Sequence, residues 1–222
     1  MNNIIDSFHK VAQLRRENLF RDDRLMPITH REDANTAAPG WVGHDYQPGS
    51  IVLLGINPGG GGDAYRGNPT DRALYGRLRA FRDASPQDLE AAFTRLNESW
   101  LSIQQTHSLW RVISAALDAT GLRSSQVAFL NMLPFRTRED KTAPSAVMAN
   151  AWRLAAQPQI RALAPKAIVT LGFKAADALD RLANTGSVPR VFRLKRARGD
   201  TRITDEARAT LAELHDWMDS RG

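Results

Sequence analysis

The sequence predicts an α/β fold in which a parallel sheet is covered by helices on both faces. Four short apolar runs are spaced along the chain, and each has the length and composition of a buried strand. Segments with helical periodicity separate the runs, and such alternation is typical of a parallel sheet between two layers of helices. The 222 residues are enough for one domain with a sizeable core. We therefore expect a single domain over residues 1–222.

The first 50 residues are expected to form a helical and irregular lead-in that packs on this domain. Residues 3–20 place apolar side chains at helical spacing on one face. Residues 27–50 contain several prolines and glycines, which interrupt regular structure. The first strand, residues 51–55, follows directly.

Helices then alternate with the remaining three strands. The expected helices cover residues 71–81, a segment that begins at Ser85 and Pro86, residues 108–120, residues 144–163 with a kink at Pro158, residues 173–182, and a last segment that Thr204 caps. The expected strands are residues 127–131, 167–171 and 188–194. A proline in the last strand suits an edge position, because it removes one backbone donor.

Composition indicates a cytoplasmic protein that binds a polyanion. The 30 Lys and Arg residues exceed the 24 Asp and Glu residues, which gives a net charge of +6. Such a charge favours DNA through phosphate neutralisation, although solubility alone is the alternative explanation. The absence of cysteine excludes disulfides and thiolate metal sites. No secretory signal and no apolar stretch long enough for a membrane span is present, and we expect a monomer.

The most unusual local feature follows the first strand, where Asn57 and Pro58 precede four consecutive glycines at 59–62. Such a run indicates a close approach to the backbone, and open α/β folds bind ligands at this edge of the sheet. A Walker A loop is excluded, because no Gly-Lys-Ser/Thr follows. Residues 59–64 fit a dinucleotide-binding pattern, but the acid that it requires, Asp83, would end a helix instead of a strand.

Three motifs, in order, resemble the uracil-DNA glycosylase superfamily. Residues 55–59, Gly-Ile-Asn-Pro-Gly, resemble its first motif in the Asn-bearing form of the mismatch-specific and single-strand-selective branches. Residues 129–131, Phe-Leu-Asn, resemble the strand whose last asparagine reads the flipped base, and residues 165–172 with Ala175 resemble a later strand-Gly-helix segment. The resemblance spans about residues 51–180. It implies a three-layer sandwich with a central four-stranded parallel sheet, and a DNA glycosylase that needs no metal or organic cofactor.

The resemblance also implies site residues around the first motif. Asn57 is expected to orient the attacking water, and Asp63 is a second catalytic candidate because a carboxylate is the stronger base. The alternatives are turn chemistry for Asn57 and a solvated loop position for Asp63. Asn131 is expected to pair with the edge of a base, or else to cap a turn. The full set of expected base-binding residues is Gly55, Ile56, Pro58, Gly59, Gly60 and Asn131.

The chain departs from the family pattern after the fourth strand. The family places His-Pro-Ser there, whereas this chain has Lys195, Arg196 and Arg198, and none of its five histidines follows that strand closely. The three cations are expected to contact DNA phosphates, and the two arginines could also supply positive charge to a leaving base. An ordinary solvated turn is the alternative.

Two further questions concern the pocket and the function. His44 and Asp45, beside Trp41 and Tyr46, could line a base pocket, or they could belong to a packed lead-in loop. The bare glycine loop leaves room for a base larger than uracil, such as a hypermodified phage cytosine, which suggests DNA repair or anti-phage defence. The alternatives are a non-catalytic nucleic-acid-binding protein on the same fold and an enzyme acting on free nucleotides or nucleosides.

Overall fold

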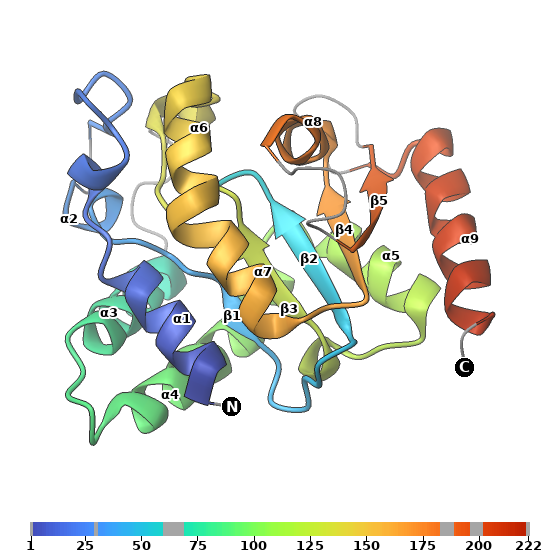
Figure 1. Ribbon diagram of the computed structural model, residues 1–222, viewed down its shortest axis with the longest axis horizontal. Helices are drawn as coiled ribbons and strands as arrows, with labels where there is room; N and C mark the ends of the chain where they lie inside the picture. Colours follow the sequence, from blue (N-terminus) through green and yellow to red (C-terminus); the bar gives the residue numbers. More distant parts are fainter. Residues whose placement is uncertain (1, 29–30, 60–68, 183–188, 196–201, 221–222) are drawn as a thin grey trace.

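A computed structural model describes residues 2–28, 31–59, 69–182, 189–195 and 202–220. Its centre is a five-stranded sheet with the strand order β1-β3-β2-β4-β5, flanked by helices (Figure 1). The strands are β1 Trp41–Val42, β2 Ile51–Gly55, β3 Ala128–Asn131, β4 Ala167–Leu171 and β5 Arg190–Leu194. The α-helices are α1 Asn2–Ala12, α2 Arg31–Ala34, α3 Pro69–Arg82, α4 Leu89–Ile103, α5 Trp110–Thr120, α6 Ser145–Ala151, α7 Gln157–Leu163, α8 Phe173–Leu182 and α9 Asp205–Asp219. The predicted α/β class is confirmed.

All four predicted strands are present, and β3, β2, β4 and β5 pair in parallel. β5 lies at the edge of the sheet, as Pro189 predicted, but the strand begins at Arg190, after this proline, instead of at residue 188. The lead-in adds a fifth strand that the sequence did not predict, because β1 pairs antiparallel with β3 and has only two residues. A strand of two residues is too short to show the alternation of apolar and polar residues by which strands are recognised in a sequence.

Two expected helices differ from the prediction. The amphipathic segment at 3–20 remains helical only to Ala12, and a separate 3-10 turn at Arg16–Asn18 follows. This break directs the Arg16 guanidinium into the interior, where it donates to the carbonyl oxygens of Leu25 and Arg136 at 2.8 and 2.7 Å. The segment at 144–163 is continuous but contains a π-helical stretch, Trp152–Ala156, shortly before Pro158. Proline lacks the N–H that an α-helical hydrogen bond needs, and the π-helical stretch accommodates it without ending the helix.

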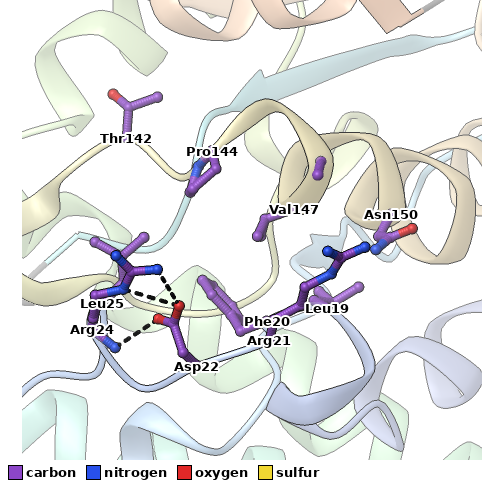
Figure 2. Close-up of a pocket in the computed structure, with 11 residues that line it drawn as sticks. Leu19, Phe20, Arg21, Asp22, Arg24, Leu25, Thr142, Pro144, Val147 and Asn150 are labelled. Atoms are coloured by element: carbon purple, nitrogen blue, oxygen red, sulfur yellow. Dashed lines mark hydrogen bonds and ion pairs between the residues drawn. The ribbon is translucent and has the colours of Figure 1, made fainter.

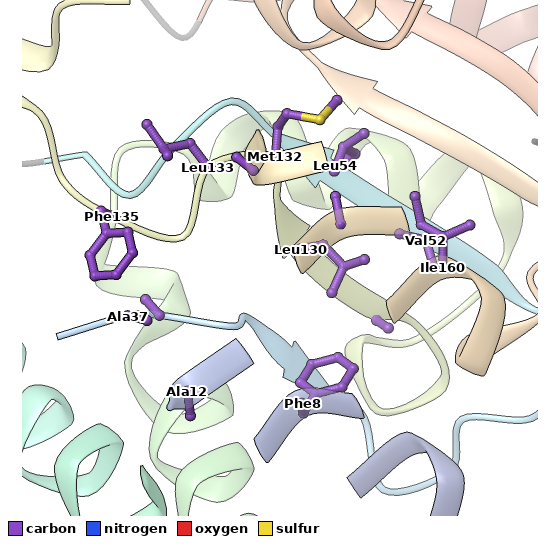
Figure 3. Packing of buried hydrophobic residues seen from close by; sticks show 14 of the residues in the cluster. Phe8, Ala12, Ala37, Val52, Leu54, Leu130, Met132, Leu133, Phe135 and Ile160 are labelled. Carbon is purple, nitrogen blue, oxygen red and sulfur yellow. The ribbon is translucent and has the colours of Figure 1, made fainter. Parts of the chain in front are cut away.

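The sheet separates two apolar cores, because successive side chains of a strand point to opposite faces. Val52, Leu54 and Leu130 face a core shared with α1, α3, α4, α6 and α7, part of which Figure 3 shows. Leu53, Phe129 and Val169 face the other core, shared with α5 and α9. Both faces of β2 are therefore buried, which leaves its carboxyl end as the part of the strand that can serve a site.

The parallel strands end together at one edge of the sheet, toward which the arrowheads of β2, β4 and β5 point at the top of Figure 1. The first-motif residues follow β2 at this edge, and Asn131 ends β3 there. Among the described helices, none has the length and apolarity to cross a membrane.

Candidate functional site

Asn57 lies two residues beyond the end of β2 and is half-buried. Its side-chain nitrogen Nδ2 donates to the carbonyl oxygen of Pro58 at 3.1 Å and to the hydroxyl of Thr137 at 3.4 Å. Thr137 is fully buried, and its hydroxyl donates to the carbonyl oxygen of Lys141 at 2.6 Å. The amide of Asn57 is therefore held from two sides.

These contacts fix which way the amide of Asn57 faces. A hydroxyl has one proton, and Thr137 gives it to Lys141, so toward Asn57 the hydroxyl is an acceptor. The Pro58 carbonyl is also an acceptor, so both contacts require the nitrogen of the amide. The oxygen Oδ1 of Asn57 is left to accept a hydrogen bond from another group, such as a water.

Asn131 is buried at the end of β3, with 3% of its surface exposed. Among the described residues, no hydrogen bond involves its side chain. The backbone next to it is held firmly, because the Met132 N–H donates to the Gly55 carbonyl and the Leu133 N–H to the Ile56 carbonyl, both at 2.9 Å. The amide atoms of Asn131 are still reached by solvent, so its unused donors and acceptors are open to a water or a ligand. Asn131 is therefore the second polar group of this edge.

Gly55 makes room for the amide of Asn131. The two residues are register partners in the parallel ladder, and a Cβ atom on Gly55 would lie 2.8 Å from Oδ1 of Asn131. Replacing Gly55 by Ala is expected to displace this amide, because 2.8 Å is shorter than any ordinary carbon–oxygen contact. We expect a modest loss in stability, because the amide must shift to relieve this contact, and thermal unfolding measures it. An unchanged midpoint of unfolding would mean that the Asn131 amide moves aside at no cost.

The other expected site residues differ in what the structure says of them. Pro58 is buried and Ile56 is half-buried against the core, so both support the loop more than they face outward. Gly59 is exposed, and no atom lies within 4 Å of where its Cβ would be. Lys195 follows β5, with its ammonium 3.3 Å from Glu206. Gly60, Asp63, Arg196 and Arg198 lie outside the described residues.

Of the lead-in residues weighed as a pocket lining, Trp41 and Tyr46 belong to the core, whereas His44 and Asp45 are exposed. Trp41 is 1% exposed and stacks on Phe129 at 6.0 Å between ring centroids. Tyr46 is buried, and its hydroxyl donates to the Leu163 carbonyl. Asp45 pairs through its backbone with Ser125, before β3 begins, and so lies away from the carboxyl edge. Trp41 and Tyr46 therefore follow the packed-loop interpretation.

Two buried arginines near Thr137 were not predicted from the sequence. Arg136 is 5% exposed, its guanidinium lies 4.4 Å from the ring centroid of Tyr75, and desolvation lowers its pKa to about 9, against the opposing charges of Asp33 and Asp140. Desolvation likewise lowers the pKa of Arg16 to about 10. Charged side chains are rarely buried, so sequence patterns place them outside the core. Arg16 donates to the backbone carbonyl of Arg136, which precedes Thr137, the residue that contacts Asn57.

In the described parts of the chain, the possible metal ligands are His, Asp and Glu side chains. No group of three or more His, Asp or Glu side chains in the described parts of the chain could hold an ion. Three of the described histidines have polar partners elsewhere: His9 with the Arg82 carbonyl, His44 with Asp45, and His215 with the Ala119 carbonyl. The fourth, His107, packs its ring against Trp100.

Comparison with known proteins decides the family. The model of the uracil DNA glycosylase superfamily matches residues 45–214, which include β2 to β5 and most of α9. The chain belongs to the uracil-DNA glycosylase superfamily. No curated protein matches it. The match confirms the resemblance inferred from the three motifs, and for this superfamily member it supports a DNA glycosylase type of activity with DNA as the substrate.

Proposed function

We propose that this superfamily member is a DNA glycosylase that hydrolyses the N-glycosidic bond of a flipped-out damaged or modified base and leaves an abasic site. The observation that carries the proposal is the fixed amide of Asn57, which turns Oδ1 away from its protein partners. Asn131, buried and without a side-chain hydrogen bond in the described structure, supplies a group that can pair with the edge of a base.

The proposed reaction breaks the bond between C1′ of the sugar and the base nitrogen. The base leaves with the bonding electrons, the sugar gains oxocarbenium character, and the oxygen of a water bonds to C1′. One proton of that water is released, and the base ends as a neutral species after taking up a proton. The amide of Asn57 is a very weak base, so its role is to orient the water and to face the sugar cation with Oδ1. Asp63 remains the candidate for accepting the proton of the water.

The carboxyl edge also carries side chains suited to DNA. Phe173 begins α8 directly after β4 and is 41% exposed, and an exposed aromatic ring can stack on an unpaired base. Lys174 beside it is exposed, and Lys195 follows β5 at the same edge. The ion pair of Lys195 with Glu206 lies on the surface, where such pairs contribute little, so Lys195 can exchange Glu206 for a phosphate. Arg196 and Arg198 extend this proposed phosphate contact.

A cleavage assay tests the function. Oligonucleotides that contain uracil, mismatched thymine or a modified cytosine are incubated with the protein and then treated with alkali, which cleaves the strand at an abasic site. A product from at least one of these bases, formed without added metal, is expected. Tight binding with no product from any base would favour a non-catalytic DNA-binding protein. The absence of the His-Pro-Ser motif is the observation that suggests this alternative.

The absence of side chains in the glycine loop is proposed to let the pocket accept a base larger than uracil. Gly59 is exposed with open space around its missing Cβ, so the fold itself does not require glycine there. Replacing Gly59 by Val is expected to leave the midpoint of thermal unfolding nearly unchanged. It should lower kcat/KM for a bulky modified cytosine by about tenfold, and that for uracil by less. Equal losses on both bases would argue against a pocket shaped for a large base, which the anti-phage role requires.

A further inference from the structure

A cavity of about 420 Å³ lies between residues 19–25 of the lead-in and the first part of α6 (Figure 2). Its walls are mostly apolar and include Leu19, Leu25 and Val147. Its volume falls in the range of pockets that hold small organic groups. None of the residues that line it was assigned a role by the motifs or by the family match.

The floor and the mouth of the cavity differ in chemistry. The floor includes Phe20, whose ring has the guanidinium of Arg16 4.0 Å from its centroid. At the mouth, Asp22 is neutralised by Arg24 through a contact of 2.7 Å. Arg21 makes no ion pair within the described parts of the chain, so the mouth carries one uncompensated positive charge.

The cavity is joined to the catalytic segment by hydrogen bonds. The Leu25 carbonyl accepts from the backbone N–H of Arg138 at 2.8 Å. Arg138 follows Thr137, which holds the amide of Asn57. Thr142 lines the cavity and follows Lys141, whose carbonyl accepts the Thr137 hydroxyl proton. The loop at 137–142 thus links the two places: its Thr142 lines the cavity, and its Thr137 contacts Asn57.

We propose that this cavity binds a second, unstacked base of the DNA strand, near the nucleotide that is hydrolysed, with Arg21 on its phosphate. This inference rests on the proposed function for the position of the strand. Apolar walls, an aromatic floor and a cation at the mouth match a planar base that carries a phosphate. The net charge of +6 favours the same anionic partner. A base held there must leave the stack, so the enzyme prefers single-stranded DNA and depends on the base at that position.

The test blocks the cavity with a large side chain introduced at its rim. Ala146 is exposed and lines the cavity, so Ala146→Trp blocks it without entering the core. Ala149 is also exposed on α6 but lies outside the lining, and Ala149→Trp is the matched control. Binding is measured by fluorescence anisotropy with short single-stranded oligonucleotides in which one base at a time, apart from the target base, is replaced by an abasic spacer.

For the wild-type protein, a spacer at one position is expected to weaken binding by about tenfold, the size of one lost base–aromatic contact. Ala146→Trp should bind the complete oligonucleotide about tenfold more weakly and lose its response to the spacer, whereas Ala149→Trp should behave as wild type. Arg21→Ala, at an exposed side chain, should reduce the slope of log affinity against log salt by about one.

An unchanged response to the spacer in Ala146→Trp overturns the proposal, and so does equal weakening of every oligonucleotide. Because the readout is binding, it is independent of excision. If Ala146→Trp removes the response to the spacer but the wild-type protein excises no base, the second base site is supported and the glycosylase activity is contradicted. If the protein excises a base but neither the wild type nor a variant responds to the spacer, the activity is supported and the second base site is contradicted.

Discussion

Replacing Asn57 by Ala is expected to lower the rate of base excision by about 10²–10⁴-fold and to leave DNA binding near the wild-type value. The reason is that Oδ1 has no hydrogen-bond partner among the described residues and can accept from the water, while Nδ2 is held by Pro58 and Thr137. Single-turnover kinetics measures the chemical step, and anisotropy with the same oligonucleotide measures binding. Loss of binding in parallel with the rate would mean that Asn57 holds the base instead of the water.

Thr137 provides the control for this prediction. Thr137→Val keeps the shape of the buried side chain but removes the acceptor for Nδ2 and the donor to Lys141. The amide of Asn57 then loses its fixed direction, and we expect about a tenfold loss in rate. Thr137→Ser, which keeps the hydroxyl, should restore most of it. If the valine and serine variants fall equally, the effect comes from packing and the orientation argument fails.

The sequence predicted those parts of the site that lie at the ends of regular elements. β2 and β3 are short apolar runs buried on both faces, so their carboxyl ends, and Asn57 and Asn131 with them, could be placed at one edge of a sheet. Thr137 could not be found in this way. Its contact with Asn57 joins residues 80 positions apart, and nothing in the neighbouring residues indicates it.

The same reason explains why the cavity and the buried arginines were missed. The cavity is formed by residues 19–25 and the first part of α6, which only the folded chain brings together. Arg16 reaches the carbonyl of Arg136, 120 positions away, and ends an otherwise well-formed helical pattern early. Local periodicity carries no information on such a contact, so the predicted helix over residues 3–20 was too long.

Among the described glycines at which the surroundings of a Cβ are known, Gly40 combines a positive φ with the shortest contact, so its substitution is expected to disturb the fold strongly. It has a φ of +96°, and a Cβ there would lie 2.0 Å from the carbonyl oxygen of Phe129. This close approach is what lets β1 pair with β3, with Trp41 opposite Phe129. Gly40→Ala would force β3 to move at Phe129, and we expect a loss of about 4 kcal/mol or more in the free energy of unfolding, measured by urea denaturation.

Gly49 separates the two causes of the expected loss at Gly40, which are backbone strain at positive φ and the steric contact with Phe129. It also has a positive φ, +87°, but nothing lies within 4 Å of where its Cβ would be. Gly49→Ala should therefore show the backbone strain alone, about 1–2 kcal/mol. The difference between the two variants measures the steric contact at Phe129. A Gly40→Ala protein as stable as Gly49→Ala would mean that β1 can separate from β3 at little cost. The position of Asn131, two residues beyond Phe129, would then depend on its pairing with β2 alone.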